Sequence, residues 1–299
     1  MRIATWNVAS IRARAALVVD FLLREDIDVL ALQETKCRPE QFPTAIFEAA
    51  GYQVVNHGFH AFNGVAFVSR HDMTDVTFGL PSLPGFGEQY LPTQPPGANG
   101  LPQEARALGV TVNGMRLWSL YVPNGRDLAH EHYAYKLRWL QALQQEVAGW
   151  MEAEPQLPLA LLGDWNVAPL PSDMGDPDFA EGRSTHVSRP ERQAFAAFES
   201  YLSDVVRPYV PHGYTFWEYR GGKYQADQGM RIDFILGSEG FSSAVTGAFI
   251  AADERRERQA APGQKALKPS DHVPVVCEIA PELLGQSWED EEDPMIWGL

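Results

Sequence analysis

Short apolar runs recur along this chain, and each carries a polar or acidic residue at one end. Runs of this length, bounded by turn residues, predict buried β-strands. The runs and their polar ends are residues 3–6 with Asn7, 29–32 with Glu34, 117–122 with Asn124, 159–162 with Asp164 and Asn166, 234–236 with Asp233, and 273–276 with Asp271 and His272. In the last two runs the polar residue precedes the strand. If those two strands run antiparallel to the others, all the polar groups lie at one edge of the sheets.

Helical periodicity separates several of these strands. Apolar stripes predict helices over residues 11–23 and 133–150. Ser188 and Glu191 form a capping box that opens a third predicted helix, which runs to Leu202. Strands that alternate with helices, some of them antiparallel, predict an α/β fold with mixed sheets.

Other segments depart from this alternation. Residues 79–104 hold six prolines and five glycines, which predict a long surface loop inserted into one domain spanning 1–281. The aromatic run 214–220 is typical of a core strand. Residues 252–269 form a second predicted loop, and the acidic segment 282–299 is expected to be a solvated tail. The second loop carries a group of basic residues, namely Arg255, Arg256, Arg258, Lys265 and Lys268.

Composition and charge narrow the class of protein. Of the 299 residues, 45% are hydrophobic and 21% are charged, as in ordinary globular domains. The net charge of −15 argues weakly against a nucleic-acid partner, although it does not describe the local potential. No apolar run is long enough to cross a membrane, and because the first strand starts at Arg2 no signal peptide is expected. Cys37 and Cys277 lack zinc-like spacing and are expected to be reduced, which favours a cytoplasmic protein.

The sequence Gly163-Asp164-Trp165-Asn166 is the first candidate for chemistry. In an extended segment Asp164 and Asn166 would point the same way. A carboxylate can orient or deprotonate a water, and a neutral amide can donate a hydrogen bond to a phosphate oxygen. Alone, the pattern fits an Asp/Asn turn equally well, because such turns commonly follow strands.

The remaining strand ends carry groups that suit metal-assisted phosphate chemistry. Glu34 is a plausible ligand for a hard cation such as Mg²⁺. Asp271 places a second carboxylate beside His272, and Asp233 could orient that imidazole as a buried carboxylate does in catalytic pairs. Tyr121 could reach a phosphate oxygen. Each residue alone is as easily a loop or packing residue, so the prediction of a site depends on their occurring together.

Taken in order, these residues resemble the exonuclease III family of apurinic/apyrimidinic endonucleases, a branch of the endonuclease/exonuclease/phosphatase superfamily. The resemblance runs in register from residue 1 to about 280. The matching segments are Trp6-Asn7, Leu32-Gln33-Glu34-Thr35-Lys36, Asn63-Gly64-Val65-Ala66, Glu104-Ala105-Arg106, Tyr121-Val122-Pro123-Asn124-Gly125, Gly163-Asp164-Trp165-Asn166, Phe216-Trp217-Glu218-Tyr219-Arg220, Arg231-Ile232-Asp233 and Ser270-Asp271-His272-Val273-Pro274.

The resemblance implies a four-layer α/β sandwich of the DNase I-like kind, with two packed mixed sheets flanked by helices. It implies a Mg²⁺- or Mn²⁺-dependent phosphodiesterase of base-excision repair that cuts DNA 5′ to an abasic site. A 3′→5′ exonuclease and 3′-end-cleaning activity is expected beside it. The implied partner is duplex DNA with abasic sites or 3′ ends, with no membrane. A monomer is expected, in the cytoplasm and, in a bacterium, associated with the nucleoid.

The resemblance also assigns roles by position, and it leaves open whether Asp164 or His272 takes the proton. The implied catalytic residues are Tyr121, Asp164, Asn166, Asp233 and His272. The implied metal site consists of Asn7, Glu34, Asp164, Asn166, Asp271 and His272, with Glu34 the main ligand. The implied DNA contacts and walls of the abasic pocket are Lys36, Arg106, Asn124, Phe216, Trp217, Met230 and Ile232.

One departure from the family pattern is Ala9, because relatives usually have Asp or Asn there, close to the metal. It motivates an alternative in which the chain binds damaged DNA with weakened catalysis. A second alternative keeps the fold but changes the substrate to RNA or another phosphodiester, which the negative net charge favours slightly.

Overall fold

Two six-stranded mixed sheets form the centre of the computed structural model, which describes residues 1–88, 91, 93–257 and 267–284. The first sheet has the order β11 (Val245–Ile250), β12 (Val275–Ile279), β1 (Arg2–Asn7), β2 (Val29–Gln33), β4 (Val65–Ser69), β3 (Gln53–His57). The second has the order β5 (Thr74–Phe78), β6 (Ala107–Val112), β7 (Met115–Tyr121), β8 (Leu159–Asp164), β10 (Asp233–Gly237), β9 (Ser203–Asp204).

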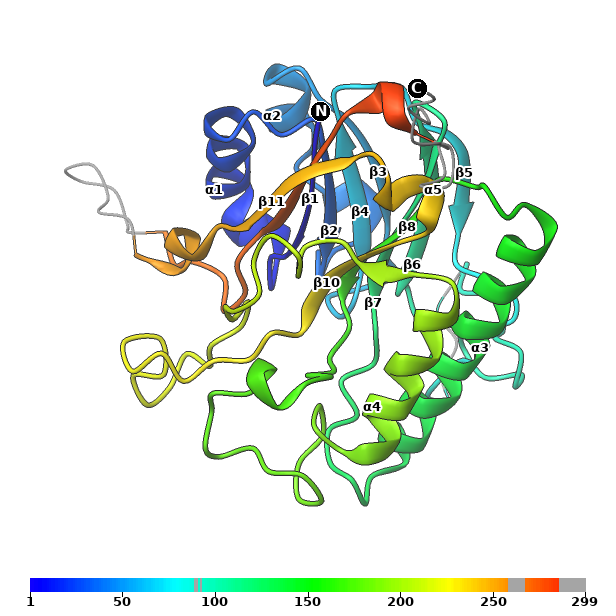
Figure 1. Ribbon diagram of the computed structural model, residues 1–299, viewed down its shortest axis with the longest axis vertical. Helices are drawn as coiled ribbons and strands as arrows, with labels where there is room; N and C mark the ends of the chain where they lie inside the picture. Colours follow the sequence, from blue (N-terminus) through cyan, green and yellow to red (C-terminus); the bar gives the residue numbers. More distant parts are fainter. Residues whose placement is uncertain (89–90, 92, 258–266, 285–299) are drawn as a thin grey trace, which may run out of the picture.

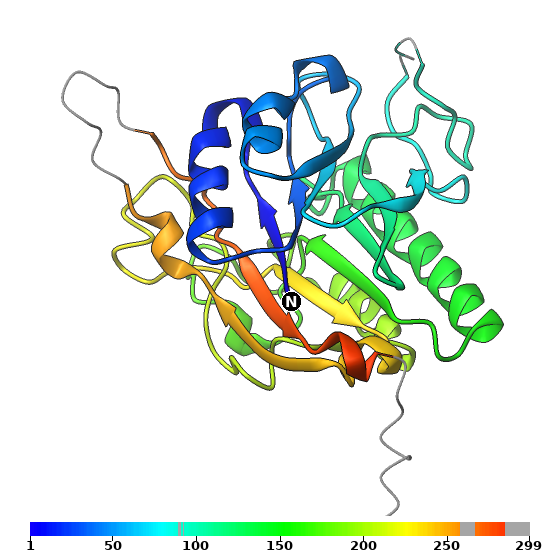
Figure 2. The same cartoon turned by 90° about the horizontal axis from the view of Figure 1, so that it is seen from above.

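Helices cover the outer face of each sheet and give the four layers that the family resemblance implies (Figures 1 and 2). α1 (Ile11–Arg24) and α2 (Thr44–Ala49) pack on the first sheet, and α3 (Glu131–Ala153) and α4 (Arg189–Ala196) on the second. The short helix α5 (Glu239–Ser242) follows β10. Single 3₁₀ turns span Pro39–Gln41, Pro171–Asp173, Ala197–Ser200, Ala252–Arg255 and Pro281–Leu283. Among the described residues, no helix is both long and apolar enough to pass through a bilayer.

The core between the sheets is apolar and consists of side chains from both. It includes Ile3 and Val29 of the first sheet and Leu117, Leu162 and Ile235 of the second, all fully buried. Because successive side chains in a strand point to opposite faces, the alternate residues of the same strands pack under the helices. The strands are therefore held on both faces, which fixes where their ends lie.

Strand direction brings the predicted polar ends to one edge. β1 pairs parallel with β2, and β7 pairs parallel with β8. β12 pairs antiparallel with β1, and β10 antiparallel with β8, so that Asp233 is in register with Asp164. The prediction that the last two strands run against the others is confirmed.

Two local predictions were wrong. The aromatic run 214–220 forms no regular strand and makes only isolated bridges, from Phe216 to Met230 and to His272. It crosses the strand ends, since the Thr215 hydroxyl accepts from the Ile232 and Asp233 amides (3.1 and 3.2 Å). The capping box at Ser188 is confirmed, but α4 ends at Ala196 and a 3₁₀ turn follows.

The long loop and the tail are only partly described. Within residues 79–104, positions 89, 90 and 92 lie outside the described residues; the rest is irregular, apart from an isolated bridge between Pro96 and Pro102. Leu83 of this segment is buried against the core under α3. Residues 285–299 of the acidic segment lie outside the described residues. So do residues 258–266 of the second predicted loop, 252–269.

Substitution of Gly163 in β8 tests how closely β7 and β8 approach each other. A Cβ there would lie 1.9 Å from Leu120 O, whereas a Cβ on Gly149 in α3 would meet nothing within 4 Å. Gly163→Ala is expected to lower the free energy of unfolding by about 2–4 kcal/mol. Gly149→Ala is expected to raise it by about 1 kcal/mol, because alanine favours a helix. Urea unfolding followed by circular dichroism measures both, and equal effects would contradict the strand geometry.

Candidate active site

Asn7 joins the two sheets at the edge where the polar strand ends meet. Its amide Nδ2 donates to Glu34 Oε1 (3.0 Å) and to Asp164 Oδ2 (2.9 Å). Glu34 follows β2 of the first sheet, and Asp164 ends β8 of the second. The Asn7 oxygen accepts from the Ala9 amide (3.0 Å), so the amide nitrogen faces the two carboxylates. In this arrangement the Asn7 amide is a donor that holds the two carboxylates together.

The backbone at this edge turns sharply after the strands. Glu34, Lys36 and Asn166 all have positive φ, between 51° and 53°. Such conformations are unfavourable for residues with a side chain and persist where surrounding contacts impose them. Here the Thr35 and Lys36 amides donate to Gly64 O and Asn63 O, which fixes the turn that presents Glu34.

A second chain of contacts runs through His272. Its Nδ1 lies 2.8 Å from Asp233 Oδ2, and its Nε2 lies 3.8 Å from Asp164 Oδ2. All three residues are buried, and they form a compact group of candidate metal ligands within the described part of the chain. Glu34, Asn7, Asp164, His272 and Asp233 are thus linked in series across both sheets.

Charge at this edge is strongly perturbed. Burial opposes the imidazolium, but the Asp233 and Asp164 carboxylates outweigh it and raise the pKa of His272 to about 10. Burial also raises the pKa of Asp164, and Asp233 adds to the increase although His272 opposes it. For Glu34, burial favours the neutral form, yet Lys36 (Nζ–Oε2 2.5 Å) and Asn7 hold the pKa below its ordinary value.

Asp164 and Asn166 do not point the same way, contrary to the sequence prediction. The chain turns at Asn166, whose amide donates to Asp164 Oδ1 (2.9 Å), as in an Asx-turn. The Asn166 side chain donates to Val122 O (2.9 Å) and accepts from Asn124 Nδ2 (3.2 Å). Asn166 and Asn124 therefore tie the ends of β7 and β8 together.

Sequence reasoning missed the residues that support Asn166. His186 Nδ1 lies 2.7 Å from Asn166 O, and burial lowers the pKa of this histidine to about 3, so it is neutral. The fully buried Lys136 of α3 donates to the same oxygen (2.6 Å) and pairs with Glu191 of the α4 capping box. The available signal was a lysine between apolar positions of an amphipathic helix.

Tyr121 and Arg106 form one packed unit. Arg106 is 4% exposed, and its guanidinium lies over the Tyr121 ring (4.7 Å) and pairs with Glu104 (2.7 Å). Burial, together with the charge of Glu34, raises the pKa of Tyr121 well above its ordinary value, so the hydroxyl keeps its proton. Arg106 is thus placed behind Tyr121, and Glu104 also accepts from Asn63 Nδ2 (2.8 Å).

An apolar cluster lies beside His272. Met230 and Ile232 are 1% exposed and pack with Ala168 and Val187, and the half-buried Phe216 contacts this group. The Phe216 ring lies 4.9 Å from the His272 ring. Trp217 is also buried, and its ring contacts those of Tyr214 and Tyr224 (centroids 6.3 and 5.2 Å). Of the predicted pocket residues, Phe216, Met230 and Ile232 therefore lie together beside His272.

Asp271 is half-buried, and Ser270 Oγ approaches its Oδ1 (3.3 Å) while donating to Asn7 O (2.7 Å). Its charge contributes to the raised pKa of His272. Ala9 lies beside Asn7 with φ 48°, a left-handed conformation that Asn and Asp adopt more readily than Ala.

The donor set fits a hard divalent cation. Carboxylate oxygens of Glu34 and Asp164 are both held by one amide, and Asp233 adds a further buried negative charge nearby. Asp233 Oδ1 is buried, and no described residue forms a hydrogen bond with it. Oxygen donors of this kind suit Mg²⁺ or Mn²⁺, and a cation would offset the negative charge that raises the pKa of Asp164.

Comparison with known proteins agrees with this geometry. Residues 4–272 match the endonuclease/exonuclease/phosphatase family. An exodeoxyribonuclease of Bacillus subtilis (strain 168) is 28% identical, covering 92% of this chain and 98% of its own length. The 3′ phosphatase NExo from Neisseria, solved with a product DNA hairpin, superposes with TM-score 0.79 at 35% identity over 94% of this chain and 99% of its own.

An AP endonuclease from Archaeoglobus fulgidus superposes with TM-score 0.78 at 31% identity, covering 93% of this chain and 99% of its own. These similarities span nearly the whole of each protein. The chain is therefore a member of the endonuclease/exonuclease/phosphatase family and, within it, of the exodeoxyribonuclease III and AP endonuclease group of phosphodiester hydrolases.

Proposed function

We propose that this protein is a metal-dependent DNA phosphodiesterase of base-excision repair that cleaves 5′ to abasic sites. A 3′→5′ exonuclease and 3′-end-cleaning activity accompanies it. The observation that carries the proposal is the continuous series Glu34–Asn7–Asp164–His272–Asp233 beside the apolar cluster. The relatives named as an exodeoxyribonuclease, a 3′ phosphatase and an AP endonuclease support it. The protein acts as a monomer on duplex DNA, in the cytoplasm.

Glu34 and Asp164 hold Mg²⁺ or Mn²⁺ in this proposal, with Asp271 near enough to contribute charge. The bound cation supplies Lewis-acid stabilisation of the negative charge that develops on the phosphate. Tyr121 keeps its hydroxyl proton and donates it in a hydrogen bond to a phosphate oxygen, while Arg106 and Glu104 hold the ring in place. Asn166 positions Asp164 through its backbone amide.

Proton transfer is assigned to Asp164. With its pKa raised to about 10, His272 is already protonated at neutral pH and cannot accept another proton. Asp164 is the remaining carboxylate beside His272 that can accept the proton of the attacking water (Oδ2–Nε2 3.8 Å). His272, fixed by Asp233, then contributes a positive charge to the scissile phosphate.

Substrate selection is assigned to the apolar cluster beside His272. In this proposal Phe216, Met230 and Ile232 are the apolar wall against which the sugar of an abasic site lies. Extruding the sugar also costs least where base pairing is already lost. RNA or another phosphodiester remains the alternative substrate of the same fold, and a DNA-binding protein with weakened catalysis is the other alternative.

Incision of a labelled duplex with one abasic-site analogue tests the proposal. In Mg²⁺ the protein is expected to cut on the 5′ side of the analogue, and chelator is expected to stop it. Asp164→Asn is expected to lower the rate by about 10²-fold or more while binding changes little, because the base is lost but the shape is kept. Asp72→Asn, an exposed carboxylate after β4, is the matched control.

Cleavage of RNA in place of abasic DNA would favour the first alternative. Tight binding of the abasic duplex without incision would favour the second. Normal incision by Asp164→Asn would remove Asp164 from its role as base.

The pH dependence of incision tests the assignment of His272. Asp233 is the largest of the charges that raise the histidine pKa, so the imidazolium persists as pH rises toward 10. Asp233→Asn is expected to lower that pKa, and the alkaline fall in activity should move down by about one to three pH units. Rates measured from pH 6 to 10 in both proteins would show the change. An unmoved alkaline limb would mean that His272 need not be charged.

Two substitutions at Ala9 distinguish the effect of backbone strain on stability from the effect of an added carboxylate on Mg²⁺ binding. Both Ala9→Asn and Ala9→Asp are expected to raise the free energy of unfolding by about 0.5–1 kcal/mol, because both adopt a left-handed conformation more easily. Only Ala9→Asp adds a carboxylate beside Asn7, so it alone should lower the Mg²⁺ concentration for half-maximal activity. Incision rates at several Mg²⁺ concentrations give the half-maximal value, and calorimetric titration gives the Mg²⁺ affinity. Equal Mg²⁺ affinities of the two variants would exclude a metal role for position 9.

A further inference from the structure

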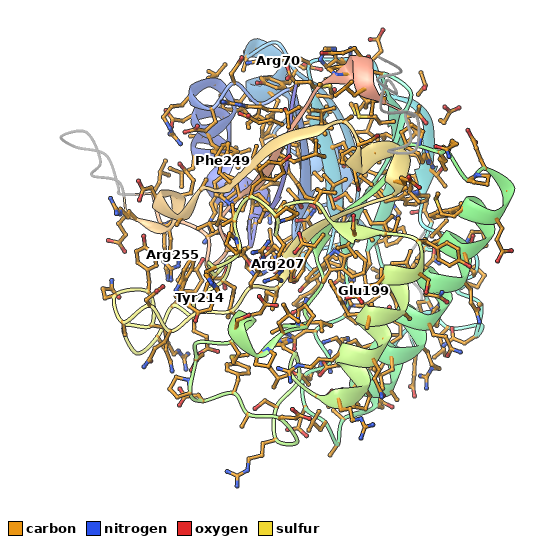
Figure 3. The ribbon with its side chains drawn as sticks, viewed as in Figure 1. Arg70, Glu199, Arg207, Tyr214, Phe249 and Arg255 are labelled. Atoms are coloured by element: carbon orange, nitrogen blue, oxygen red, sulfur yellow. The ribbon has the colours of Figure 1, made fainter. Side chains whose placement is uncertain are left out.

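A cavity of about 410 Å³ opens next to the catalytic edge, between the segment after Trp217 and the 3₁₀ turn Ala252–Arg255. Its walls include the rings of Tyr219 and Tyr224 and four basic side chains, Lys223, Arg255, Arg256 and Lys268. Two carboxylates, Glu218 and Glu257, also line it. Figure 3 labels Arg255 on this side of the molecule, toward the open loops and away from Arg70.

Two of the four cations are already neutralised. Lys223 pairs with Asp176 (2.7 Å) and Asp178 (2.5 Å), and Arg256 pairs with Asp253 (3.0 Å). Arg255 and Lys268 have no carboxylate partner within the described ranges. Both lie over the same ring, with Lys268 Nζ 4.0 Å and Arg255 Cζ 4.9 Å from the Tyr219 centroid. Two unpaired cations that share one ring repel each other unless an anion lies between them.

The Arg255 side chain is held in place by its neighbours. It is 9% exposed, its guanidinium also lies 5.6 Å from the Tyr224 ring, and Nη2 donates to Trp217 O (3.3 Å). Among the described residues its buried Nε has no hydrogen-bond partner. A buried donor without a partner costs free energy, and phosphate is the anion that the planar fork of a guanidinium fits.

The cavity continues the catalytic centre along the chain. Pro269 lines it, and His272 is three residues further on, so the two backbones lie within about 11 Å of each other. Tyr219 and Arg14 both donate to Pro269 O (2.9 and 3.2 Å), which holds this wall in place. One strand of DNA carries a phosphate about every 3.4 Å of its axis, so about three nucleotides span this separation.

We propose that this cavity is a subsite for a DNA backbone phosphate within about three nucleotides of the scissile phosphate, with Arg255 and Lys268 as its ligands. The inference rests on the proposed function, because it takes DNA as the substrate. It gives a chain of net charge −15 two cations beside the catalytic edge, Arg255 and Lys268, that no described carboxylate pairs with.

The first test measures binding of an abasic-analogue duplex, in chelator, at several salt concentrations. Lys268→Gln alters an exposed side chain and should leave the fold intact. It is expected to weaken binding about three- to tenfold and to reduce the slope of log affinity against log salt by about one. Lys268→Arg should retain both values. Arg70→Gln removes one positive charge at the top of the view in Figure 3, away from Arg255, and should leave the slope unchanged.

The second test locates the phosphate. Single methylphosphonate linkages, which are neutral, are placed at each of four positions on either side of the incision site in both strands. At one position the substitution should weaken binding by the wild type but have little further effect on Lys268→Gln, because both changes remove the same contact. Losses that add at every position would overturn the subsite.

Failure of this inference is distinguishable from failure of the proposed function. If the wild type incises the abasic duplex but no position couples to Lys268, the subsite is wrong and the function stands. If one position couples but no incision occurs in Mg²⁺, the subsite stands and the proposed activity is wrong.

Discussion

One hydrogen-bonding side chain, Asn7, sets the geometry on which the catalytic edge depends. Its amide reaches a carboxylate on each sheet, so Glu34 and Asp164 stay in contact only while the two sheets keep their relative position. A buried polar network below it has the same effect, since Gln33 Nε2 donates across the sheets to Ser119 Oγ (3.0 Å). Ser119 in turn donates to Leu32 O (3.0 Å). Apolar packing between sheets is not directional, whereas these bonds specify one alignment.

The same edge concentrates negative charge that the nearby cationic side chains do not fully offset. Asp164 and Asp233 are buried within reach of one histidine, and Glu34 is only one amide away. Such clustering costs stability and is typical of sites that bind a cation. Arg255 and Lys268, which pair with no carboxylate in the described part of the chain, are the opposite case a short distance away. The catalytic edge is therefore suited to bind a cation, whereas the cavity beside Arg255 is suited to bind an anion.

Strand ends were predictable from sequence because apolar runs and their polar boundaries reflect burial directly. β1, β2, β7, β8, β10 and β12 were all found this way, and so was the edge they share. Edge strands such as β5, four of whose five residues are exposed, carry no such signal. The turn at Asn166 and the path of Phe216 could not be predicted, because each depends on contacts from distant segments. Lys136 and His186 were missed for the same reason: their partner, Asn166 O, is distant in sequence.

The hydrogen bonds of Asn7 across the two sheets make the active site sensitive to the relative position of the sheets. Successive residues along a strand are about 3.3 Å apart, so a slip of a single residue between the sheets would exceed the length of the Asn7–Asp164 bond. Helices and strands could survive such a slip with their content unaltered. Catalytic competence would then be lost before any spectroscopic sign of unfolding, and heat or mutation would inactivate the enzyme in a state that still looks folded.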